Sequence, residues 1–199
     1  MPIPSGTKFH GVAPGIDTED KGSARTNANR DAYTLEEFIV AAGGAGSLGW
    51  SRHDDSQYTA AAPLVLNEVD GYVTMPNNSN NTVLGPGGYS MYDAGTEKFL
   101  GLATNDVYVV TVAFIASAAN ANQTHLDWRL VGSGDISRVA GVIAFHKGNN
   151  TAQSENVIMQ YYTDADFVAN GAQLQIRTEG GTASIWGVIY FIQRTQYGG

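Results

Sequence analysis

The decisive stretch of sequence is Ser184-Ile185-Trp186-Gly187-Val188-Ile189-Tyr190-Phe191-Ile192. Branched aliphatic and aromatic residues favour β-strands, and successive side chains of a strand point to opposite faces. Both faces of this predicted strand are therefore apolar. In an isolated antiparallel sandwich a strand usually keeps one face in water. The stretch consequently predicts a strand whose second face is also covered.

A second run has the same property. Within 107–116, one face carries Val110, Val112 and Phe114, and the other carries Val109, Ala113 and Ile115. The second apolar face of each strand could be covered by another copy of the chain, or by a helix or loop of the same chain. We favour another copy, because obligate interfaces resemble a protein core cut in half.

These two strands define the expected interface between subunits. On the last strand we assign Ile189 and Phe191 to the internal core and the alternating residues to the interface. The predicted interface residues are Val109, Ala113, Ile115, Trp186, Val188, Tyr190 and Ile192.

The rest of the chain from residue 47 onward reads as further short strands separated by turns. Leu126, Trp128 and Leu130 alternate with polar residues, as in a half-buried strand. The other predicted strands are 58–66, 71–75, 90–93, 98–102, 139–145, 157–162 and 174–177, and 77–88 is predicted to be a loop. Many evenly spaced strands predict an all-β fold, an antiparallel sandwich or barrel, over 47–199.

Residues 1–46 differ from the remainder. Thr34 and Glu37 form a capping box that predicts a short helix over about 34–42, followed by a Gly-rich hinge at 43–46. The preceding segment has no strand or helix periodicity. It is either an unordered tail or an arm that docks on a partner, and its scattered anchors would be Phe9, Val12, Ile16 and Tyr33.

Composition excludes several classes of function. The chain has no cysteine, so thiol nucleophiles and zinc–thiolate sites are ruled out. A net charge of -8 argues against partners made of nucleic acid or anionic membrane. The sequence starts without a basic segment leading into an apolar one, so we expect no secretory signal.

Catalytic and metal-binding patterns are weak. His10, His53, His125 and His146 are present, but no Gly-x-Ser-x-Gly elbow accompanies them. The 52–55 segment, and Asp164 with Asp166, could hold a cation, although polar loops explain both. We predict no enzyme activity, no cofactor and no metal. His125 and His146 are expected to be hydrogen-bonded at an edge or interface.

Aromatic residues suggest a further alternative. Trp50, Tyr72, Tyr89, Tyr92 and Tyr108 could form a sugar-binding surface by stacking. In a strand-rich protein such residues more often belong to the core or to an interface.

Two stretches resemble a known family. The succession 50–55, 59–65, 73–78, 91–93, 102–106 and 126–130, and the closing 167–176 and 184–191, are similar to the tumour-necrosis-factor-like jelly-roll module of phage structural proteins. The 6–12, 21–24 and 30–34 segments resemble leader segments of virion proteins in phages of aquatic bacteria. The resemblance implies a compact trimer, with the last and the long middle strands lining the threefold axis.

The residue patterns and the family resemblance together give the expected function. The chain would be a non-enzymatic virion protein of a bacteriophage, assembled in the host cytoplasm and anchored by its arm to capsid or tail. A capsid decoration, cement or head-fibre protein is the first expectation, because the sequence has no heptad run for a fibre shaft. The alternative is a tail-fibre or spike tip that attaches to a host receptor or glycan.

Overall fold

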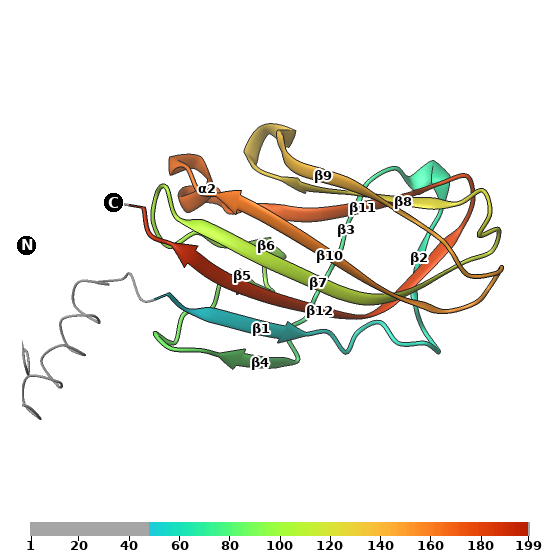
Figure 1. Ribbon diagram of the computed structural model, residues 1–199, viewed down its shortest axis with the longest axis horizontal. Coiled ribbons are helices and arrows are strands. Elements are labelled where there is room, and N and C mark those ends of the chain that lie inside the picture. Colours follow the sequence, from blue (N-terminus) through green and yellow to red (C-terminus); the bar gives the residue numbers. More distant parts are fainter. Residues whose placement is uncertain (1–47, 199) are drawn as a thin grey trace, which may run out of the picture. The chain divides into compact units, whose positions relative to one another are not determined.

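The computed structural model describes residues 48–198. The predicted arm, its anchors Phe9, Val12, Ile16 and Tyr33, the helix over 34–42 and the hinge at 43–46 lie outside the described residues. The described residues form an antiparallel β-sandwich of jelly-roll type, as predicted (Figure 1).

One layer is a six-stranded sheet. Its strands are β1 (Trp50–Asp54), β2 (Leu64–Leu66), β4 (Asn81–Leu84), β7 (Val107–Ala118), β10 (Gln153–Tyr162) and β12 (Ala183–Gln196). They are ordered β10-β7-β12-β1-β4, and β2 pairs with one end of β12. The long strands β7 and β12 are neighbours inside this sheet. They contain the two apolar runs that the sequence analysis identified.

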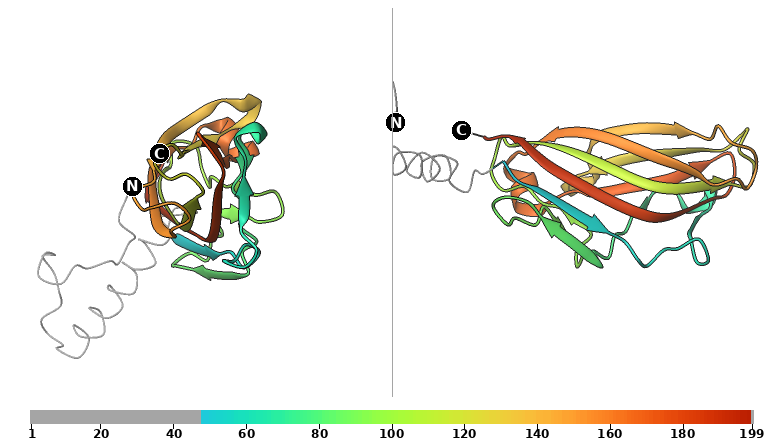
Figure 2. Two further views of the ribbon diagram at one scale, coloured as in Figure 1. Left: turned by 90° about the vertical axis from the view of Figure 1, so that its right-hand side faces the viewer. Right: turned by 60° about the horizontal axis from the view of Figure 1, so that its bottom comes forward.

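The second layer is a four-stranded sheet in the order β3-β11-β8-β9. Its strands are β3 (Val73–Thr74), β8 (His125–Val131), β9 (Ser137–Ala144) and β11 (Gln173–Glu179). A small hairpin of β5 (Tyr92–Asp93) and β6 (Lys98–Phe99) stands beside it. The chain crosses between layers from β7 to β8, from β9 to β10 and from β11 to β12, and Figure 2 shows the two layers face to face.

Within residues 48–198, short helices accompany the strands. They are η2 (Glu68–Asp70), η3 (Ser133–Asp135) and α2 (Ala165–Asn170). The sequence predicted only a turn near Asp164. In the structure Asp164 is the N-cap of α2, since its carboxylate accepts a hydrogen bond from the Phe167 amide at 2.8 Å.

The core fills the space between the layers. Tyr108, Tyr190, Phe99 and Phe167 are its largest fully buried side chains. The rings of Tyr190 and Phe99 lie 5.0 Å apart, and the tilted contact favours close packing of aromatic edges and faces.

One pair of opposite charges is built into this core. The buried carboxylate of Asp106 accepts hydrogen bonds from the Tyr108 hydroxyl at 3.1 Å and from the Ala103 and Gly198 amides at 2.9 Å. The buried guanidinium of Arg194 also contacts it. Because a buried charge is costly without partners, this cluster ties the end of β12 to the start of β7.

Two predicted segments differ in the structure. Only Leu64–Leu66 of the expected 58–66 strand is β-structure, with an isolated bridge between Thr59 and Ala62 before it. Part of the expected loop at 77–88 is the edge strand β4, which pairs with β1. The Asn- and Gly-rich composition of this region is typical of turns, so the sequence did not indicate β4. This strand depends on β1 for its hydrogen bonds.

Candidate functional site

The outer face of the six-stranded sheet carries an apolar surface. Residues paired across antiparallel strands share a face, so the register defines this surface directly. It runs from β10 to β4 through the pairs Ile115–Trp186, Ala113–Ile189 and Arg52–Val83, together with Val109, Ile158, Phe191 and Trp50. We call the apolar residues of this set the outer apolar face.

Several of its side chains reach solvent in the single chain. Ile158 is 69% exposed, Val83 42% and Phe191 36%. The Phe191 and Trp50 rings lie 5.5 Å apart. Gly85 on the loop after β4 leaves room for Trp50, because a Cβ at this position would lie 2.5 Å from its indole. Polar residues such as Asp54, Asn81 and Gln160 surround this surface.

Four of the predicted interface residues lie on this face. Val109, Ala113 and Ile115 alternate with buried residues along β7, and Trp186 lies opposite Ile115 on β12. Their placement on an outward face agrees with the sequence analysis. Whether another subunit covers them is a separate question, and it stays a prediction.

The other three predicted interface residues are placed wrongly by the sequence analysis. Val188, Tyr190 and Ile192 lie in the internal core, each at most 1% exposed. Ile189 and Phe191, assigned to the core from the sequence, lie on the outer face instead. The Tyr190 hydroxyl donates to the Met75 carbonyl inside the sandwich, so this side chain cannot line a subunit interface.

A β-bulge at Gly187 explains the error. The pairing of β12 with β7 shifts between Trp186 and Ile189, and Gly187 has a φ of 62°. The bulge adds one residue, so the inward and outward positions exchange beyond it. An isolated glycine inside a strand pattern is the sequence signal that could have indicated this.

The outer face of the four-stranded sheet has the opposite character. Arg129 and Arg177 project from β8 and β11, and their guanidinium carbons lie 4.1 Å and 4.7 Å from the centre of the Tyr72 ring. Arg129 also donates to Gln175 at 2.9 Å. The arginines of this face therefore find their partners within the chain, as is usual on a surface that is exposed to solvent.

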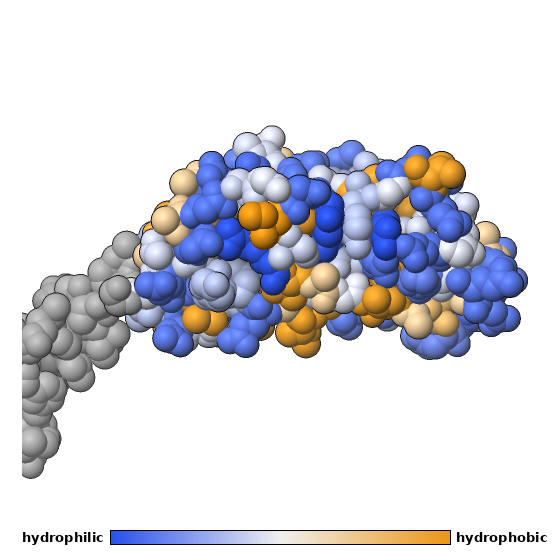
Figure 3. Space-filling view, turned by 90° about the horizontal axis from the view of Figure 1, so that it is seen from above, coloured by the Kyte–Doolittle hydropathy of each residue, from blue (hydrophilic) through white to orange (hydrophobic). Residues whose placement is uncertain are grey.

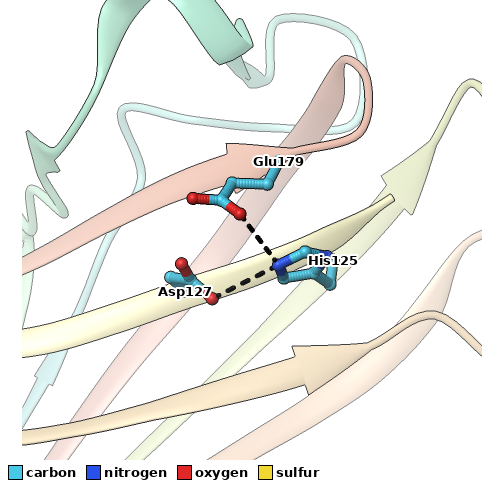
Figure 4. Close-up of side chains that lie close together, drawn as sticks. All are labelled: His125, Asp127 and Glu179. Carbon is cyan, nitrogen blue, oxygen red and sulfur yellow. Dashed lines mark ion pairs between the residues drawn. The ribbon is translucent and has the colours of Figure 1, made fainter. Parts of the chain in front are cut away.

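A cluster of His125, Asp127 and Glu179 lies at one end of this polar face (Figure 4). His125 Nε2 is 3.6 Å from Asp127 Oδ1 and 3.3 Å from Glu179 Oε2. The donor set could hold a cation. Arg177 already pairs with both carboxylates, so we interpret the cluster as an ion-pair network across β8 and β11.

Other predicted cation sites have protein partners as well. The 52–55 segment is mostly strand β1 rather than a loop, and Arg52 bonds Asp54 at 2.8 Å. Asp164 and Asp166 both bind the Arg138 guanidinium, at 2.8 Å and 3.0 Å. The hydrogen bond from Arg138 is the main reason that the pKa of Asp164 is lowered.

His53 is buried between hydroxyl groups. Its Nε2 lies 3.0 Å from Ser51 Oγ and its Nδ1 lies 3.0 Å from Ser79 Oγ. Burial lowers the pKa of His53, and nearby Asp54 opposes this shift. Hydroxyls rather than a carboxylate orient the ring, so the group lacks the third member of a catalytic triad.

The two other described histidines lie nearer solvent. His125 belongs to the ion-pair network, and His146 is exposed, with its ring nitrogen 3.9 Å from Glu155.

The aromatic residues considered for sugar binding do not share a surface. Tyr92 and Tyr108 are buried in the core. Trp50 lies on the outer apolar face, whereas Tyr72 precedes β3 and contacts arginines of the other sheet. That grouping is therefore wrong, because alternation in the sequence did not reveal which sheet each residue joins.

Comparison with known proteins gives no family. No family model and no curated protein matches the sequence. Among solved structures, the chain is similar to Eiger TNF from S. frugiperda, with 11% identity and a TM-score of 0.46 over 76% of this chain and 94% of that one.

Other similar structures include a virus particle and a binding module. The infectious bursal disease virus Gt strain is 8% identical with a TM-score of 0.41, covering 74% of this chain and 33% of that one. A carbohydrate-binding module from Cellvibrio mixtus lichenase 5A is 13% identical with a TM-score of 0.29, covering 66% and 71%. These likenesses are too distant to indicate a function, which we therefore infer from the chain's own surfaces.

None of the helices within residues 48–198 has the length and apolar character that crossing a membrane requires.

Proposed function

We propose that this chain is a non-enzymatic surface protein of a bacteriophage virion and that it works as a homotrimer. In this proposal the sandwich is the trimerisation domain and the 1–46 arm anchors it to the capsid or tail. A capsid decoration, cement or head-fibre protein is the role we favour.

The observation that carries the proposal is the outer apolar face. Trp186, Ile189 and Phe191 form its centre on β12, flanked by the apolar side of β7. Ile158, Val83 and Phe191 are 36–69% exposed in the single chain, and apolar side chains gathered on one face often mark a protein–protein interface. A second copy of the chain is a suitable cover, because identical subunits arranged around an axis close such a surface without leaving an open end.

The first test is the mass of the purified chain in solution. Light scattering should give about three times the chain mass of 21.1 kDa. Phe191→Asp should dissociate this assembly, since a charge buried in a closed apolar interface is costly even with Arg52 opposite it on β1. Circular dichroism distinguishes a folded monomer from an unfolded chain.

Val142→Asp is the matched control. Val142 is 65% exposed on β9 of the other sheet, so the same charge there should leave the mass unchanged. A wild-type chain that is monomeric at micromolar concentration, or a Phe191→Asp variant that keeps the full mass, would contradict the proposal.

The position on the virion needs a different measurement. Electron microscopy of particles labelled at this chain distinguishes a head location from a neck or tail location. The alternative function, a fibre or spike tip that binds a host receptor or glycan, shares the fold and the trimer, and it requires a ligand site in addition.

A further inference from the structure

A cavity opens between the edges of the two sheets. β9 and β10 are edge strands of different sheets and run along the same side of the sandwich (Figures 1 and 2). The cavity has a volume of about 450 Å³, which lies within the range of small-ligand pockets. Its lining residues are Ile136, Ser137, Arg138, Val139, Gln160, Tyr161, Tyr162 and Asp164.

Two polar atoms in the residues lining this cavity lack a hydrogen-bond partner. They are the Tyr161 hydroxyl and Arg138 Nε, and both are buried. Tyr161 is 5% exposed and its ring stacks on Phe167 at 4.8 Å. Buried polar groups nearly always have a partner in folded proteins, and an exception often marks a missing water or ligand. Neither atom is accessible to solvent, so a ligand in the cavity would reach them only if the lining shifted.

The charged groups of the cavity are held in fixed positions. Arg138 binds Asp164 and Asp166 at once, so its planar guanidinium cannot rotate freely. Two carboxylates outweigh one guanidinium, and the local charge is negative. An anionic ligand is disfavoured here, whereas a neutral one meets oriented donors and acceptors.

The rest of the lining combines apolar and polar groups at the surface. Tyr162 and Ile136 are each 65% exposed, and the polar side chains of Gln160 and Ser137 are exposed beside them. From above, where β9 and α2 lie uppermost in Figure 1, the surface shows separate hydrophobic spots among hydrophilic residues (Figure 3). Such a mixture suits a ligand with apolar faces and many hydroxyl groups.

We propose that the cavity between β9 and β10 binds a neutral saccharide. The Tyr162 ring would stack on the apolar face of a sugar ring, and Gln160, Ser137 and Asp164 would hydrogen-bond its hydroxyls. The cavity lies within one chain. Its binding groups need no second subunit, but Gln160 also borders the outer apolar face, where it pairs with Val109. The mass of each cavity variant is therefore measured together with its affinity, so that loss of the trimer and loss of the sugar site can be told apart.

An array of immobilised neutral and acidic bacterial oligosaccharides tests the proposal with the full chain. We expect binding to neutral members, followed by saturable titration of the same free oligosaccharide in calorimetry. An array without any bound member, or with acidic members alone, overturns the proposal.

Variants of exposed residues locate the site. Tyr162→Ala and Gln160→Ala should each weaken binding by about tenfold or more, because stacking and oriented hydrogen bonds are lost. Val142→Ala is the control, since Val142 is exposed on β9 but does not line the cavity. Unchanged affinity in both cavity variants, or an equal loss in the control, places the sugar elsewhere and overturns the proposal.

Discussion

The burial of His53 makes part of the free energy of unfolding depend on pH. Burial lowers the pKa of His53 below its ordinary value of 6.5. In the unfolded chain the ring takes up a proton as the pH falls through this value, while the folded chain does not. The unfolded state then binds more protons, so the free energy of unfolding falls with decreasing pH.

The prediction at this scale concerns His53→Gln. The variant should lose less free energy of unfolding than the wild type between neutral pH and about pH 5, as measured by urea denaturation. His146→Gln is the control because His146 is exposed, and it should follow the wild-type curve. Equal slopes for all three proteins would show that His53 is not the titrating group.

At the scale of elements, the bulge in β12 decides which side chains form the core. Gly187 has a φ of 62°, and a Cβ placed there would meet nothing within 4 Å. A substitution is therefore opposed by backbone strain alone. We expect Gly187→Ala to lower the free energy of unfolding by about 1–2 kcal/mol.

A second glycine separates strain from loss of flexibility. Gly148 also has open space, with its nearest contact, the Thr151 hydroxyl, at 3.8 Å, and it lacks the positive φ. Gly148→Ala should be close to neutral in the same denaturation experiment. A Gly187→Ala variant as stable as Gly148→Ala would argue against the bulge.

The same elements show what the sequence can reveal. The alternation of Leu126, Trp128 and Leu130 and the long runs of β7 and β12 correctly predicted buried strands. The sandwich and the outward side of β7 followed from them. The outward side of β12 beyond Trp186 did not, because one inserted residue reverses the alternation without changing the composition.

The cavity also lay beyond sequence reasoning. Its lining comes from β9, from β10 and from the start of α2, and no local pattern relates these segments to one another. Asp164 and Asp166 suggested a cation, but the partner is Arg138, which lies 26 and 28 residues earlier in the chain. Only the pairing of strands into two layers brings these groups together.

For the whole molecule, the proposal assigns anchoring to the arm and trimerisation to the sandwich. This assignment gives one further prediction. Deleting residues 1–45 should leave a soluble trimer with nearly unchanged thermal stability, because the arm has few apolar residues and the expected Gly-rich hinge at 43–46 separates it from the sandwich. The same deletion should abolish incorporation into particles. Co-sedimentation with virions that lack the protein measures this, with the full chain as control. Binding of the truncated trimer would make the sandwich itself the anchor.

The position of β12 in the six-stranded sheet also affects when the chain can fold during its synthesis. β12 pairs with β1, β2 and β7, yet of the described strands it is the last to be synthesised. Until it emerges, the central strand is missing and the side chains that contact it remain uncovered. The growing chain therefore cannot complete its sheet gradually during translation. Its earlier strands must wait in an aggregation-prone state, and a premature stop before residue 183 would yield no folded product.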